Sequence, residues 1–171
     1  MFELLRARRM RRAAAQTIGP WVDRSRRRLG AIPDEKWRDP YMMGFLASLI
    51  SVLAERATRG RVSDDALGMV QSEAWAEITG VRYLPFGEEV CLLSSNGDPA
   101  FRRGCSNALT FTRLVLDGSL DATADVAEAF APQDFETVPI APAAEDDFAV
   151  FGRGGATAAV LWEQYFERAI A

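Results

Sequence analysis

The most restrictive feature of the sequence is a run of fourteen residues, Tyr41 to Ala54, that contains only apolar and small side chains. It is shorter than the roughly twenty residues that a membrane-spanning helix needs. Asp39 and Pro40 precede the run, and this pair is typical of a helix start. An aspartate oxygen accepts amide protons of the first turn, and proline has no amide proton to leave unbonded. The run therefore predicts a helix, from residue 41 to about 58, that is buried on nearly every side.

Small side chains form a strip along this central helix, and such a strip lets another helix approach closely. The helix that packs there is expected to belong to the same chain, while contact with a second copy in a homodimer is the alternative. The residues assigned to this contact are Gly44, Ala47, Ser48 and Ser51.

The first thirty residues are predicted to form two helical pieces. Apolar side chains recur there at spacings of three and four, which produces a single apolar stripe on a helix. Gly19 and Pro20 interrupt the pattern, so Pro20 is expected to begin a second helix that Gly30 ends. Because the stripe continues across both pieces, the segment is expected to dock on the rest of the protein. The stripe consists of Ala7, Met10, Ala14, Ile18 and Trp21.

Further helices are predicted to begin at Ser63, at the pair Asp98 and Pro99, near residues 119 to 121, and at Thr157. Glycines at 80 and 118 are expected to end the first two of these. Residues 81 to 95 carry a weaker pattern, in which a short β segment is the alternative to a helical turn. The sequence thus predicts an all-α fold, an irregular single-domain bundle of six or seven helices. It is divided into an arginine-rich segment, residues 1–30, and a bundle, residues 31–171, with a proline-rich acidic loop near residues 132–149.

Charge is distributed unevenly along the chain. Residues 1–61 contain 14 basic and 6 acidic side chains, whereas residues 62–171 contain 6 basic and 18 acidic ones. The basic front is suited to an external anionic partner, but it is equally suited to neutralising the acidic part of its own or a neighbouring molecule.

The composition excludes the commonest catalytic chemistries. The chain has no histidine and a single lysine, Lys36, so the usual general base and the usual transition-metal ligand are both missing. Cys91 and Cys105 match neither a redox pair nor a zinc ligand set. Glu73 and Glu77 lie one helical turn apart, but no histidine accompanies them as a di-iron site requires. We therefore predict no catalytic residue, no cofactor and no metal.

One segment keeps an enzymatic alternative open. The glycine-rich stretch from Gly152 to Thr157 precedes a helix, and free backbone amides at such a place can hold a phosphate, with Arg153 as an assisting cation. It lacks the lysine and hydroxyl ending of a nucleotide-binding loop, and a plain turn capped by Thr157 is preferred. A small-anion-binding or carboxylate-dependent enzyme that uses this turn is the alternative function.

Nine arginines among the first 28 residues carry the main functional prediction. We expect a non-enzymatic, cytoplasmic helical interaction protein, such as an adaptor, assembly factor or regulator, that engages a protein partner. A nucleic acid would use the same arginines as phosphate contacts, and an anionic membrane would add Phe2, Leu4, Leu5 and Met10 at its surface. For a eukaryotic source, an organelle transit peptide is a further alternative. The expected contact residues are Arg8, Arg9, Arg12, Arg24, Arg26, Arg27, Arg28 and Arg153.

Overall fold

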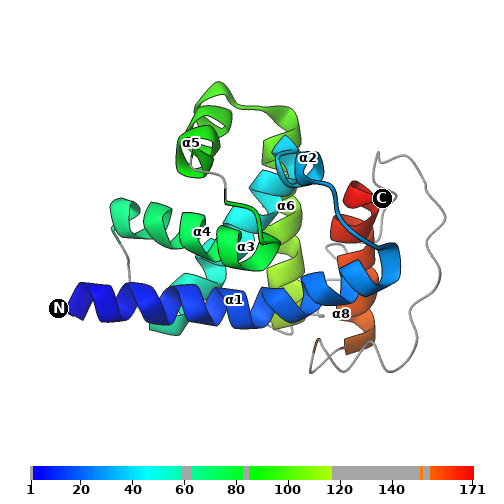
Figure 1. Cartoon of the computed structure of the whole chain (residues 1–171), viewed down its shortest axis with the longest axis horizontal. Coiled ribbons are helices and arrows are strands. Elements are labelled where there is room, and N and C mark those ends of the chain that lie inside the picture. The colour runs from blue at the N-terminus through cyan, green and yellow to red at the C-terminus, as the bar shows by residue number, and fades with distance from the viewer. Residues whose placement is uncertain (1, 59–62, 83–84, 117–150, 152–154) are drawn as a thin grey trace.

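The structure, a computed structural model, describes residues 2–58, 63–82, 85–116, 151 and 155–171. Within these ranges the chain is helical and has no strand, which confirms the all-α prediction (Figure 1). The alternative of a short β segment near residues 81–95 is wrong, because a helix occupies Phe86–Asn96. The helix predicted near residues 119–131 and the loop near 132–149 lie outside the described residues. The elements are α1 (Phe2–Leu29), α2 (Asp34–Trp37), α3 (Pro40–Thr58), α4 (Asp64–Thr79), α5 (Phe86–Asn96), α6 (Pro99–Phe111), the π-helical turn η1 (Thr112–Leu116), α8 (Gly155–Trp162), the π-helical turn η3 (Glu163–Glu167) and α9 (Arg168–Ile170).

The arginine-rich segment is one continuous helix, so the predicted break at Gly19 and Pro20 is wrong. A proline inside a helix costs about 3 kcal/mol. Burial offsets this cost, because Ile18 and Trp21, on the two sides of Pro20, are both inserted into the core. Pro20 itself is exposed, so its ring disturbs only the solvent side of the helix. The helix ends at Gly30, whose φ of 87° is favourable only for glycine.

Aspartates start two of the helices in the predicted way. The Asp39 carboxylate accepts a hydrogen bond from the backbone N–H of Tyr41 at 2.9 Å, and the Asp98 carboxylate accepts one from Phe101 at 2.8 Å. Each satisfies an amide that has no partner inside its own helix. Gly80 ends α4 in the left-handed conformation, as predicted.

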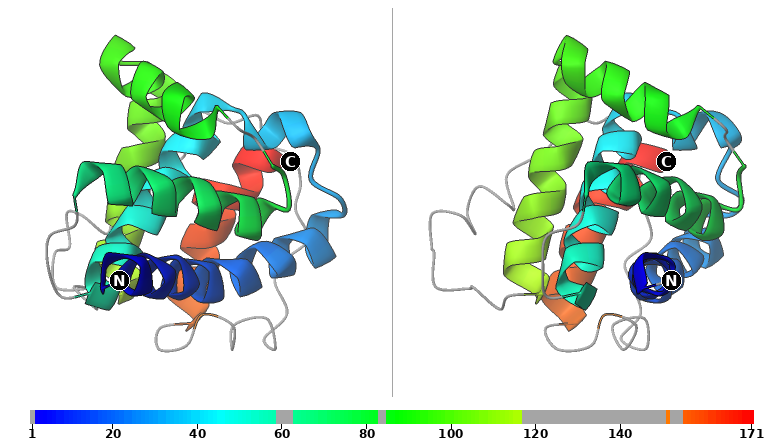
Figure 2. Two further views of the ribbon diagram at one scale, coloured as in Figure 1. Left: turned by 60° about the vertical axis from the view of Figure 1, so that its left-hand side comes forward. Right: turned by 90° about the vertical axis from the view of Figure 1, so that its left-hand side faces the viewer.

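The central position predicted for α3 is confirmed. This helix lies between α6 and the pair formed by α1 and α4 (Figure 2). Glycines allow the closest of these contacts. A β-carbon placed on Gly44 of α3 would overlap the backbone of Phe101, and one placed on Gly104 of α6 would overlap the backbone of Tyr41. The two helices can therefore approach each other only because neither position carries a side chain.

Tyr41 links three elements through its hydroxyl group. The hydroxyl donates to the backbone carbonyl of Tyr165 in η3 at 2.8 Å and accepts from the Asn107 side chain of α6 at 2.9 Å. Burial is the main reason that the pKa of Tyr41 lies above its ordinary value. The neutral hydroxyl is therefore the form that the fold favours.

One aromatic core joins the two ends of the chain. Trp21 of α1 contacts Trp162 of α8 and Phe111 of α6, with ring centroids 5.3 and 5.4 Å apart. Trp162 also stacks on Phe166 at 4.3 Å. The apolar stripe of α1 belongs to the same core, so the basic helix is docked on the bundle along its length. None of the described helices is long and apolar enough to cross a membrane.

Candidate functional site

The arginines of α1 lie in two different environments. Most of those near its C-terminal end turn inward toward acidic side chains, whereas Arg8, Arg9 and Arg12 in its first half face solvent. The two groups therefore have different roles, although the sequence placed them in one class.

The inward group centres on Glu167, whose carboxylate is buried. Arg24, with no exposed surface, donates to one of its oxygens at 2.7 Å, and the Ser25 hydroxyl donates to the same oxygen at 2.8 Å. The indole N–H of Trp162 donates in turn to Ser25 at 2.9 Å. Arg24 also lies over the ring of Phe151. Arg24 is thus a core residue, and its prediction as a partner contact is wrong because no partner can reach it.

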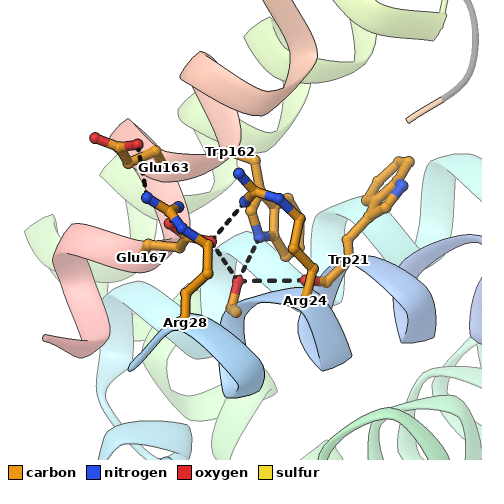
Figure 3. Close-up of polar contacts among 7 residues, drawn as sticks. Trp21, Arg24, Arg28, Trp162, Glu163 and Glu167 are labelled. Atoms are coloured by element: carbon orange, nitrogen blue, oxygen red, sulfur yellow. Dashed lines mark hydrogen bonds and ion pairs between the residues drawn. The ribbon is translucent and has the colours of Figure 1, made fainter. Parts of the chain in front are cut away.

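Arg28 completes this arrangement, which Figure 3 shows. It donates to the second oxygen of Glu167 and forms a 3.3 Å ion pair with Glu163, one helical turn earlier. Both arginines come from α1 and both acids from η3, so these ion pairs join the first helix to the last. We call this set the Glu167 cluster; it comprises Arg24, Ser25, Arg28, Trp162, Glu163 and Glu167.

Arg26 is also engaged within the chain. Its guanidinium donates to the backbone carbonyl of Thr79 at 2.6 Å, at the end of α4, and pairs with Asp23 at 3.0 Å. It also lies over the ring of Trp37. Cations at a helix C-terminus satisfy carbonyls that lack helical partners. Arg27 alone among the four basic residues of this end is exposed.

The outward group consists of Arg8, Arg9 and Arg12, which we call the arginine face. All three side chains are exposed, and in the part of the chain that the structure describes no acidic side chain forms an ion pair with them. Between them lies Arg11, which points to α4 and pairs with Glu73 at 3.3 Å and Glu77 at 3.5 Å. These pairs and the buried stripe hold the helix in one rotational setting, so the arginine face stays directed outward.

Two open hollows flank the arginine face. The first, about 390 Å³, lies between α1 and α4, and the second, about 540 Å³, lies between α1 and the end of α3. Arg8 and Arg12 line both hollows and thus form a ridge between them. The first hollow is lined by Leu4, Ala7, Arg8, Arg11, Arg12, Met69 and Glu73, and the second by Leu5, Arg8, Arg9, Arg12, Ala13, Gln16 and Ala57.

Exposed apolar side chains accompany these arginines. Leu4 is 67% exposed, Leu5 is 58% exposed, and Met69, on the facing helix α4, is 43% exposed. The membrane alternative assigned Met10 to the same surface, but Met10 is buried in the core and cannot take part. Met69 was not anticipated, because it becomes a neighbour of Leu4 only when α4 packs beside α1.

The small-residue strip of α3 is covered by other helices of this chain. Gly44 lies against the backbone of α6. Ser51 donates to the carbonyl of Ala47 at 2.8 Å and accepts from the Gln71 side chain of α4 at 2.7 Å. Ser48 is half-buried. The strip therefore makes contacts between helices of one chain.

The remaining candidates from the sequence do not belong to the arginine face or lie outside the described residues. Glu73 and Glu77 are engaged by Arg11, and no three potential metal ligands come together among the residues with described positions. Cys91 is exposed on α5, and Cys105 is half-buried against the core. Arg153, on which the small-anion alternative rests, lies outside the described residues, and that alternative stays a prediction.

The fold and this surface define a class: a small helical bundle with a docked amphipathic helix that presents arginine and leucine side chains. The chain matches no protein family model, and no curated protein and no solved structure is detectably similar to it. The function must therefore be argued from the surface itself.

Proposed function

We propose that this protein is a non-enzymatic helical interaction protein, an adaptor, assembly factor or regulator, that binds an acidic protein partner through the arginine face of α1. The observation that supports the proposal most directly is the contrast between the two groups of arginines. The inner ones have acidic partners within the chain, whereas Arg8, Arg9 and Arg12 are exposed on a helix whose opposite side is buried.

The spacing of these arginines works against the stability of their own helix. Arg8 and Arg12 are four residues apart and Arg9 and Arg12 three apart, so their charges are neighbours on the helix surface. Like charges at such spacings destabilise a helix by about 0.2–0.5 kcal/mol for each pair. A solvated helix face could avoid this cost by alternating acids and bases along the helix. The arrangement is better explained by an anion that binds there.

Carboxylates are the anions that fit this site best. A guanidinium group donates two parallel hydrogen bonds to one carboxylate and can do the same to a phosphate, so the choice between these anions rests on the charge of the whole chain. The whole chain has a net charge of -4 and a pI of about 5.0, which is far from the composition of a dedicated nucleic-acid-binding domain. An acidic protein partner is therefore favoured over a nucleic acid.

The test is a comparative pull-down from the native host with the full chain. The double substitution Arg8→Gln/Arg12→Gln removes two charges from the arginine face. Its matched control is Arg82→Gln/Arg113→Gln, because these two arginines are also exposed but lie on other parts of the surface. We expect the wild type and the control to retain the same partner and the first variant to lose it.

Two results would contradict the proposal. One is retention of the partner by the Arg8→Gln/Arg12→Gln protein at the level of the control. The other is loss of every captured protein after nuclease treatment, since the arginines would then contact phosphates. The melting temperatures of both variants should be no lower than that of the wild type, so that unfolding does not explain a loss.

A further inference from the structure

We infer that the two hollows beside the Arg8 and Arg12 ridge hold a short partner segment that combines acidic with bulky apolar side chains. The inference rests on the proposed function and narrows it, because it states which acidic sequences the site selects. Carboxylates of the segment bind the arginines, and its apolar side chains pack against Leu4, Leu5 and Met69.

The linings of the hollows show why both kinds of side chain are needed. Among the residues that the structure describes, three arginines and one glutamate line the first hollow, and three arginines with no acidic residue line the second. The glutamate of the first hollow, Glu73, is already engaged by Arg11. Each hollow therefore has an excess of positive charge, which complements an acidic ligand.

Each hollow also has apolar walls. Leu4 of α1 and Met69 of α4 line the first hollow, while Leu5 of α1 and Ala57 of α3 line the second. Covering exposed leucine and methionine side chains is favourable because it removes apolar surface from water. It also strengthens the nearby ion pairs, since less water screens them. Arginine beside an apolar pocket is the composition found at the centres of protein interfaces.

The other anionic ligands leave part of this surface unexplained. A nucleic acid backbone would engage the arginines but would leave Leu4 and Leu5 in contact with water. A membrane surface needs a broad apolar face, but the apolar stripe of α1, including Met10, is turned into the bundle. A segment with carboxylates and apolar side chains one helical turn apart matches the ridge and both flanking hollows.

The experiment measures fluorescence anisotropy of labelled probes with the full chain. The first probe is a synthetic peptide with glutamates and leucines at helical spacing. The second has serine in place of every leucine, and the third has glutamine in place of every glutamate. A single-stranded oligonucleotide and vesicles of phosphatidylcholine with phosphatidylserine serve as the competing ligands.

Variants of the protein separate the two contributions. Leu4→Ser/Met69→Ser removes apolar walls, and its matched control is Leu92→Ser/Leu109→Ser, which changes two other exposed leucines. We expect the first peptide to bind about tenfold more tightly than either altered peptide. We expect Leu4→Ser/Met69→Ser and Arg8→Gln/Arg12→Gln each to lose a similar factor in affinity for the first peptide, and we expect the control variants to keep the wild-type affinity.

The possible failures are distinguishable. If the serine peptide binds as tightly as the leucine peptide, or if Leu4→Ser/Met69→Ser has no effect, the inference is wrong while the proposed function stands. If Arg8→Gln/Arg12→Gln has no effect on any probe, or if no peptide binds, both fail. Tighter arginine-dependent binding of the oligonucleotide or the vesicles than of the peptide also overturns both.

Discussion

Replacing Glu167 with glutamine is expected to destabilise the protein more than any other single change of a charged side chain in η3. Glutamine keeps the length and shape of the side chain but removes its negative charge. That charge faces Arg24 and Arg28, and the Ser25 hydroxyl donates to the same carboxylate. Both side chains of the Arg24–Glu167 pair are fully buried, so little water can replace the lost interaction.

The size of the effect follows from this burial. Removing one member of a buried ion pair costs about 3–5 kcal/mol, because the remaining charge stays in a medium of low polarity. For a chain of this length, 1 kcal/mol corresponds to roughly 2–4 °C in melting temperature. We therefore expect Glu167→Gln to lower the melting temperature by about 6–20 °C, which is a large part of the total stability of a typical domain.

Thermal and urea unfolding followed by circular dichroism measure this change. Glu163→Gln is the matched control, because Glu163 lies one turn away on the same element, is 24% exposed and, within the described part of the chain, forms its ion pair with Arg28. Its loss should cost less than about 1 kcal/mol, as for a partly solvated pair. Equal effects of the two substitutions, or a change below about 1 kcal/mol for Glu167→Gln, would refute the argument that the Glu167 cluster holds the first and last helices together.

Three further predictions concern other parts of the fold. Gly104→Ala should destabilise the protein by about 1–3 kcal/mol or more, because the added β-carbon overlaps the backbone of α3. Gly68→Ala should stabilise it by up to about 1 kcal/mol, because no atom lies near the new carbon. Urea unfolding curves of the two variants measure both changes. The raised pKa of Tyr41 keeps its hydroxyl neutral in the folded protein. The contribution of Tyr41 to the free energy of unfolding is therefore complete below the ordinary tyrosine pKa of about 10 and falls as pH rises above it. Urea titrations from pH 9 to 11 should show a smaller fall in Tyr41→Phe; an equal fall would contradict this role. Arg8→Gln/Arg12→Gln should leave the melting temperature unchanged or slightly raised, since it removes a repulsive pair; a clear decrease would indicate that these arginines have a structural role instead.

Most helix positions could be predicted because their signals are local. Asp39 and Asp98 accept from amides two or three residues ahead of them, and Gly30 and Gly80 adopt a conformation that depends on their own lack of a side chain. The break predicted at Pro20 failed for the opposite reason. Its local cost is real, but it is outweighed by the burial of side chains on both sides, which depends on helices far away in the sequence.

At the candidate site, too, local sequence signals predicted some features and missed those that depend on distant residues. The periodicity of residues 7 to 21 correctly separated the buried stripe from Arg8, Arg9 and Arg12, because a helix has one fixed period. It could not separate these arginines from Arg24, since nothing near Arg24 in the sequence indicates Glu167. Two glutamates one turn apart in the last helix, at positions 163 and 167, were a signal that could have suggested the pairing.

The sequence by itself determined the helical class, most helix boundaries and the amphipathic character of α1, since these depend on hydrogen bonds and side-chain spacing within a few residues. Only the tertiary structure decided which arginines neutralise acids inside the protein and which remain exposed. It also brought Met69 beside Leu4 and produced the two hollows. Charge pairing and surface shape depend on distances between residues far apart in the chain, and packing of the helices sets those distances.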